Sequence, residues 1–147
     1  FRNELFSASK GDGFYFNKLK FERRSEREMS DSIIAVGVYQ DISVPHEKYL
    51  KLYSLIATKC RTMRITGSAV LDQAWIAMGR LDAYVEFTIK PWDVAGSSLL
   101  VEESGCLAGN YGKNDFSVFG KSFIFASAKV FDQLIEIFTK IEFGDSI

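Results

Sequence analysis

The residues best suited to chemistry in this sequence centre on Asp93, which lies in the run IKPWDVAG at residues 89–96. Pro91 stiffens the chain ahead of the acid, Trp92 offers a large apolar anchor, and the apolar segment that follows predicts a buried helix. Aspartate at a helix start commonly accepts hydrogen bonds from the first free amides. A rigidly held carboxylate is also suited to bind a metal ion. Capping preferences alone favour the first interpretation.

Two further stretches have the residue types of a binding site. Gly67, Ser68 and Ala69 lie between a predicted strand and a predicted helix, where free amides and the Ser68 hydroxyl can bind an anion or a polyol. The same residues are also common in ordinary turns and caps, which the local sequence favours. Glu86 lies near the end of an apolar strand, where it either accepts hydrogen bonds from sugar-like hydroxyls or is an exposed strand end. Ligands of open α/β sheets gather at such edges.

The elements that must position these residues alternate between strands and helices. A hairpin of residues 4–9 and 13–22 is expected around a turn that contains two glycines. The alternation that follows predicts an α/β fold with a mixed or parallel sheet flanked by helices. Hydrophobic periodicity and turn residues predict strands at 32–38, 62–65, 81–87, 106–108 and 122–126, and helices at 45–58, 66–78, 93–104 and 128–141, the last capped by Ser127.

Composition limits the kind of protein. The 147 residues suit one domain, and 47% apolar residues with 13 phenylalanines supply a core. A net charge of −1 argues against an extended nucleic-acid contact, and the apolar runs are shorter than the ~20 residues of a membrane span. We expect a cytoplasmic protein with Cys60 and Cys106 as reduced core residues, and we assign no catalytic role to His46, the only histidine.

Residues 67–105 resemble the carboxyl-terminal signature of the inositol monophosphatase family. The W-D-x-A-G motif of that family is matched in full at 92–96, and the run GRLDAY at 79–84 and the Gly-Ser-Ala run also match. The opening NELFSASKGDGFYFN at 3–17 resembles the family's hairpin segment, although Lys18 stands where a glycine is frequent. The resemblance extends over essentially the whole chain.

The resemblance implies a Mg²⁺-dependent phosphomonoesterase that hydrolyses inositol monophosphate or a similar ester. It makes Asp93 a catalytic metal ligand and places Gly67, Ser68, Ala69 and Glu86 in the substrate pocket, with Glu86 binding a ring hydroxyl. Two Mg²⁺ ions in such a site can activate water and stabilise the leaving alkoxide. One carboxylate has two oxygens, so capping and metal binding by the same aspartate are compatible.

The resemblance also implies the surroundings of this site. The fold is expected to be the carboxyl-terminal half of a layered αβαβα sandwich of the sugar phosphatase type, in a homodimer. The charge and the short apolar runs described above add the expectation that it contacts neither membrane nor nucleic acid directly. The family's D-P-x-D-G-T motif, to which the resemblance assigns further metal ligands, does not occur in this sequence, and neither does the Gly-Glu-Glu segment before it. Residues 1–147 are therefore expected to be the substrate-binding half of a larger protein and inactive alone.

Other functions stay open at this point. Within the enzymes, a bisphosphate nucleotidase or a fructose-1,6-bisphosphatase is the nearest rival. In a different class, bacterial proteins that resemble this chain take part in transcription and ribosome assembly through protein contacts, so a non-catalytic regulatory module is the alternative. An intact D-P-x-D-G-T motif in the parent protein would favour the enzyme, and its absence there would favour the module.

Overall fold

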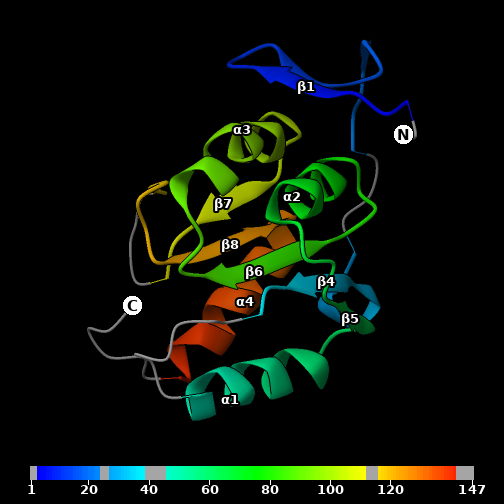
Figure 1. The fold of residues 1–147 in the computed structure, drawn as a ribbon. Coiled ribbons are helices and arrows are strands. Elements are labelled where there is room, and N and C mark those ends of the chain that lie inside the picture. Colours follow the sequence, from blue (N-terminus) through cyan, green and yellow to red (C-terminus); the bar gives the residue numbers. More distant parts are fainter. Residues whose placement is uncertain (1–2, 24–26, 39–45, 112–115, 142–147) are drawn as a thin grey trace.

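A computed structural model describes residues 3–23, 27–38, 46–111 and 116–141 as two sheets and four α-helices (Figure 1). The strands are β1 (Phe6–Ser9), β2 (Gly13–Phe16), β3 (Leu19–Lys20), β4 (Ile33–Val36), β5 (Thr62–Arg64), β6 (Ala83–Phe87), β7 (Leu107–Gly109) and β8 (Ser122–Ala126). The helices are α1 (His46–Ala57), α2 (Ala69–Ala77), α3 (Ala95–Glu103) and α4 (Ala128–Thr139), and short 3₁₀ turns lie at Met29–Asp31 and Pro91–Asp93.

The larger sheet is mixed, with five strands in the order β5-β4-β6-β8-β7. Strand β4 pairs in parallel with β5 and β6, whereas β8 pairs antiparallel with β6 and β7. The remaining strands β1, β2 and β3 form a separate antiparallel sheet. The predicted fold class, an α/β protein with a mixed sheet flanked by helices, is therefore confirmed.

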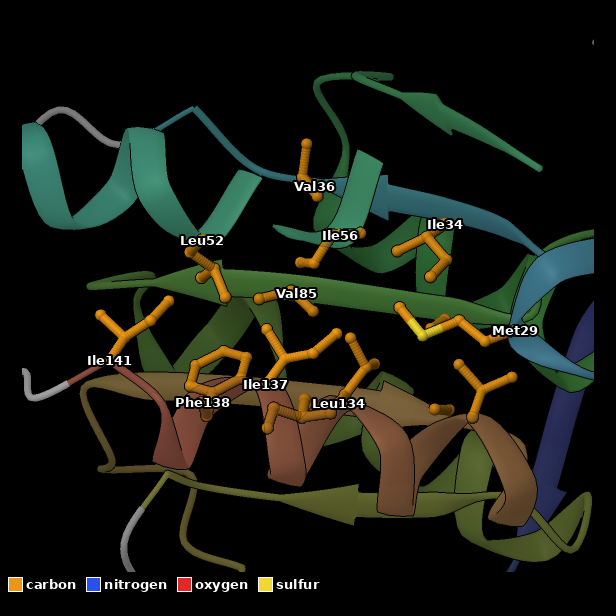
Figure 2. Close-up of a cluster of buried hydrophobic side chains, with 14 of the residues drawn as sticks. Met29, Ile34, Val36, Leu52, Ile56, Val85, Leu134, Ile137, Phe138 and Ile141 are labelled. Atoms are coloured by element: carbon orange, nitrogen blue, oxygen red, sulfur yellow. The ribbon is translucent and has the colours of Figure 1, made fainter. Parts of the chain in front are cut away.

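Helices cover both faces of the five-stranded sheet, with α1 and α4 on one face and α2 and α3 on the other, and the β1 hairpin lies over α3 (Figure 1). Figure 2 shows the first face, where Leu52 of α1 and Leu134 of α4 pack with Val85 of β6. On the second face Tyr84 of β6 packs in a cluster with Phe123 of β8 and with buried side chains of α2 and α3. Successive residues of β6 therefore point to opposite cores, as the strand period requires.

Most predicted boundaries shift by one to three residues. Helices α2 and α3 begin at Ala69 and Ala95 rather than at 66 and 93, and the predicted strand 13–22 divides into β2 and β3. Ser127 does occupy the N-cap position of α4, but its side chain makes no capping hydrogen bond. Pro45, with which the predicted helix 45–58 begins, lies outside the described residues.

Both cysteines are free, as expected, and no helix of the described ranges is long and apolar enough to span a membrane.

The hairpin is attached to the helices by charged groups at its two ends. The Glu103 carboxylate at the end of α3 accepts hydrogen bonds from the amides of Gly11 and Gly13 in the hairpin turn, both at 2.7 Å. At the other end, Arg80 donates to both oxygens of Glu4, at 2.9 and 2.7 Å. The hydrogen bonds from the Gly11 and Gly13 amides lower the pKa of Glu103.

We predict that Glu103→Gln loosens the hairpin turn from α3. The neutral amide accepts weaker hydrogen bonds than the carboxylate, so the Gly11 and Gly13 amide protons should shift upfield and exchange several times faster with solvent. Because the folded-state pKa is lowered, the wild-type contact is present above the ordinary carboxyl pKa and is lost as pH falls through the lowered value.

The neighbouring Glu102→Gln, on an exposed position of the same helix, is the matched control. It should leave both glycine amides unchanged in a ¹⁵N-resolved spectrum. If the two variants gave the same spectrum at the hairpin turn, Glu103 would have no part in attaching it.

Candidate functional site

A cavity of about 460 Å³ lies at the carboxyl ends of the parallel strands. Its lining comes from the residues after β4, the connection from β5 to α2, the strand β6 and the turn before α3. All five residues singled out in the sequence line this one cavity, namely Gly67, Ser68, Ala69, Glu86 and Asp93. The structure therefore brings together side chains that the sequence placed on three different elements.

Glu86 is buried in the sheet rather than at an exposed strand end, with 8% of its surface accessible. The Tyr84 hydroxyl donates to its Oε2 at 2.9 Å, and the Phe87 amide donates to its Oε1 at 3.0 Å. Burial raises the pKa of Glu86, the nearby charge of Asp72 raises it further, and the two hydrogen bonds oppose this rise. The carboxylate is thus oriented by its own strand and has lone pairs left for a ligand.

Gly37, which directly follows β4, makes room for that carboxylate. A Cβ at this position would lie 1.4 Å from Glu86 Oε2 and 1.8 Å from its Cδ. The Gly37 amide donates to the Val85 carbonyl at 2.9 Å, which keeps the backbone close to β6. This role of Gly37 was not predicted from the sequence, although a glycine inside an apolar strand pattern is a known sign of close backbone approach.

Asp93 belongs to the 3₁₀ turn Pro91–Asp93, and the expected helix cap is wrong. Helix α3 has Val94, not Asp93, at its N-cap position and has no side-chain capping bond, so Asp93 lies one residue before the cap. Trp92 is 75% exposed, so it does not anchor the acid as expected. The Asp93 carboxylate makes no hydrogen bond or ion pair with the described residues, so it is available to a ligand in the cavity.

A buried glutamine, rather than the tryptophan, fixes the backbone of Asp93. Gln73 of α2 donates from Nε2 to the carbonyls of both Ala69 and Asp93, each at 3.1 Å, and it has no accessible surface. The Ser97 hydroxyl donates to Gln73 Oε1 at 2.9 Å and so holds the amide group in this orientation. Gln73 therefore connects two sides of the cavity, and no local pattern indicated this role.

The connection from β5 to α2 is an open edge of the cavity. Gly67 has a φ of +80°, and a Cβ added to it would meet no heavy atom within 4 Å, so its conformation rather than its packing requires glycine. Ser68 is at the N-cap of α2 but makes no side-chain capping bond. Its exposed hydroxyl and the free amides of the helix start are thus available for hydrogen bonds with a ligand.

The cavity is acidic. Three carboxylates line it, from Asp72, Glu86 and Asp93, and no lysine, arginine or histidine is among the described lining residues. A ligand must therefore bring hydroxyl donors or a cation. Asp93 fits a Mg²⁺ ion as a single oxygen ligand. Within the described ranges no three acidic, histidine or cysteine side chains gather closely enough to hold a metal, so further ligands must come from water, substrate or other protein groups.

Fold and site together define an α/β protein with an acidic cavity at the carboxyl edge of its sheet. The model of the "Inositol monophosphatase family" matches residues 1–142, and the chain belongs to that family.

Individual relatives agree with this assignment. The Nus factor SuhB of Escherichia coli is 34% identical over 110 residues, which cover 75% of this chain and 41% of that protein. A fructose-1,6-bisphosphatase/inositol-1-monophosphatase of Thermotoga maritima is 27% identical over 139 residues, which cover 95% of this chain and 52% of that protein. The solved extragenic suppressor protein suhB of Bartonella henselae superposes with a TM-score of 0.85 at 29% identity, over 94% of this chain and 53% of that one. The chain thus spans about half the length of these relatives.

We predict that Gly37→Ala displaces Glu86 and destabilises the protein. The added methyl group occupies the position of the carboxylate, and overpacking of this kind typically costs about 1–3 kcal/mol. The loss should be much smaller in the Glu86→Ala background, where the space is free. Chemical denaturation of the two single variants and the double variant measures this coupling.

Gly96→Ala is the matched control, because Gly96 lies in α3 with no heavy atom within 4 Å of the added Cβ. It should be neutral or stabilising by at most about 1 kcal/mol. Equal losses for Gly37→Ala in both backgrounds would show that the glycine serves something other than the Glu86 carboxylate.

Proposed function

We propose that the protein carrying this chain is a Mg²⁺-dependent phosphomonoesterase for inositol monophosphate or a similar phosphate ester. In this proposal the chain is the substrate-binding half and is inactive alone. The observation that carries the proposal is that two carboxylates converge on one cavity. Asp93 pairs with none of the described residues, and Glu86 is oriented by its own strand. Family membership supports a phosphatase of this type.

Each residue has a chemical role in this proposal. Asp93, at the cavity wall without a protein partner among the described residues, binds Mg²⁺, and the ion supplies the positive charge that a phosphate needs in an acidic cavity. The Gly67–Ala69 connection offers amides and the Ser68 hydroxyl to the polar edge of the substrate. Glu86 accepts a hydrogen bond from a ring hydroxyl and thereby orients the ester.

Two alternative functions are distinguished from this proposal by the experiments below. The name of the Thermotoga maritima relative includes fructose-1,6-bisphosphatase, which makes a sugar bisphosphate the alternative substrate. The name Nus factor, carried by the Escherichia coli relative, favours a regulatory module. The large side chains of Trp92 and Phe119, exposed by 75% and 81%, would suit protein contacts, including those of a homodimer.

Asp93→Asn in the full-length protein should lower turnover at least about a hundredfold, since a lost metal ligand removes several kcal/mol of leaving-group stabilisation. Stability should change by less than about 0.5 kcal/mol, because the carboxylate bonds to none of the described side chains. Steady-state kinetics with saturating Mg²⁺ and a thermal melt measure the two quantities.

The exposed Asp132→Asn on α4 is the control for charge removal and should retain wild-type turnover. Near wild-type turnover in Asp93→Asn would remove the metal-ligand role. A full-length protein that hydrolyses no phosphate ester would favour the regulatory module.

Glu86→Gln should weaken the use of inositol 1-phosphate more than the use of a phosphate ester without ring hydroxyls. A hydrogen bond to a charged acceptor is worth roughly 1.5–3 kcal/mol, so the selective loss in kcat/KM is on the order of ten- to a hundredfold. Comparing two substrates on one variant cancels differences in folded fraction. Equal losses on both would indicate damage to the fold or to the metal, and no loss on either would exclude a ligand at Glu86.

A further inference from the structure

The carbonyl of Gly37, at the end of β4, is bound by a tyrosine from the far face of the sheet. Tyr53 lies in α1, which covers the face opposite to α2 and α3 (Figure 1). Its hydroxyl donates to the Gly37 carbonyl at 2.5 Å. The half-buried ring packs against the core of that face and beside Tyr49, with the two ring centroids 6.5 Å apart. The surroundings of the ring therefore keep the hydroxyl directed at Gly37.

This hydrogen bond lies at the point where β4 stops pairing with its neighbours. The register with β5 ends at Ala35 and the register with β6 ends at Val36, so the carbonyl of the buried Gly37 lies beyond the paired residues. A buried carbonyl without a donor is costly, and Tyr53 supplies the donor. This contribution is structural, and it would be the whole role of Tyr53 if Gly37 lay away from the site.

Gly37 instead lies directly against the Glu86 carboxylate, which occupies the space that a side chain at Gly37 would fill. The Gly37 amide donates at 2.9 Å to the carbonyl of Val85, the residue before Glu86 in β6. Two hydrogen bonds thus fix the peptide groups on either side of the Gly37 Cα, one to β6 and one from Tyr53. Without the second bond, the peptide group after Gly37 is free to rotate, and the space around the carboxylate changes with it.

We propose that Tyr53 is a positioning residue that acts through Gly37 to hold the Glu86 carboxylate in place for a substrate hydroxyl. Tyr53 is not among the described residues that line the cavity, so it acts without touching a ligand there. The recognition of a substrate hydroxyl rests on the proposed function. The coupling of Tyr53 to Glu86 rests only on the contacts of Gly37.

Tyr53→Phe in the full-length protein removes the hydroxyl and keeps the ring. The KM for inositol 1-phosphate should rise about three- to tenfold and kcat should change less than about twofold, because hydroxyl recognition weakens while Asp93 is untouched. A phosphate ester without ring hydroxyls should show less than about a twofold change in KM. In the Glu86→Gln background the same substitution should add less than about twofold, because the group that it positions is already altered.

The carboxyl ¹³C titration of Glu86, recorded without Mg²⁺, is a second measurement that does not need activity. Burial is the first cause that raises the pKa of Glu86, so a looser pocket should lower the titration midpoint toward the ordinary glutamate value, by about half a pH unit or more. Asp72, Tyr84 and Asp93 are the other described titratable groups that line the cavity, and Tyr53→Phe alters none of them.

Tyr15→Phe, the same substitution in the hairpin strand β2, is the matched control and should behave like the wild type in both measurements. A purely structural Tyr53 would lower the melting temperature of Tyr53→Phe but leave the Glu86 midpoint and the substrate preference unchanged, and that result would overturn the inference. An equal rise of KM for both esters would overturn it as well.

The two proposals can fail separately. If the full-length protein releases no phosphate from any ester but the Glu86 midpoint falls in Tyr53→Phe, the positioning role stands and the phosphatase proposal falls. If phosphate is released and the midpoint is unchanged, the phosphatase stands and the role of Tyr53 falls.

Discussion

The burial of the Glu86 carboxylate inside the sheet is the constraint on which the rest of the site depends. A buried charge requires donors, and the strand supplies two of them in the Tyr84 hydroxyl and the Phe87 amide. It also requires space, and Gly37 provides that space because glycine has no side chain. Because β6 lies between β4 and β8 with every residue buried, the carboxylate cannot turn toward solvent through an exposed strand edge.

Helices α2 and α3, which cover one face of the five-stranded sheet, position the part of the site that contains Asp93. Gln73 of α2 donates hydrogen bonds to the carbonyls of Ala69 and Asp93, and Ser97 of α3 holds its amide group in place. The beginning of β6 is fixed from the other side by Asp82, which is fully buried and accepts hydrogen bonds from Arg23, Arg27 and the Ile33 amide. The cavity is thus lined by strands and helices, and the connection at Gly67 and Ser68 is its exposed edge.

Local patterns were sufficient to predict the elements but not their contacts. The alternation of Tyr84, Val85 and Glu86 predicted β6, and the five residues singled out from the motifs all line one cavity. Local reasoning failed where a residue's environment comes from distant parts of the chain. Asp93 has a cap-like sequence, yet it is the last residue of a 3₁₀ turn and Val94 takes the N-cap position of α3, and the apolar Trp92 beside it is exposed.

The site residues that the sequence did not indicate were missed for one common reason, which is that their environment comes from distant parts of the chain. Gly37 and Gln73 act through partners 49 and 20 positions away, and a single sequence contains no signal for such pairs. Asp72 has the sequence context of an ordinary acid in a first helical turn, where the helix dipole favours it. Only the structure reveals that one of its oxygens is buried without a donor among the described residues.

The three carboxylates differ in how deeply they are buried, and this difference gives the cavity two chemical environments. Burial raises the pKa of Asp72 and of Glu86, so their charged forms are costly and each is best satisfied by neutral hydroxyl donors. Asp93 is only half-buried and has no partner among the described residues, so a hydrated cation can reach it without losing all of its water. A ligand that carries hydroxyls at one end and a cation-bound phosphate at the other matches both environments at once. Neither a bare anion nor an apolar molecule does so.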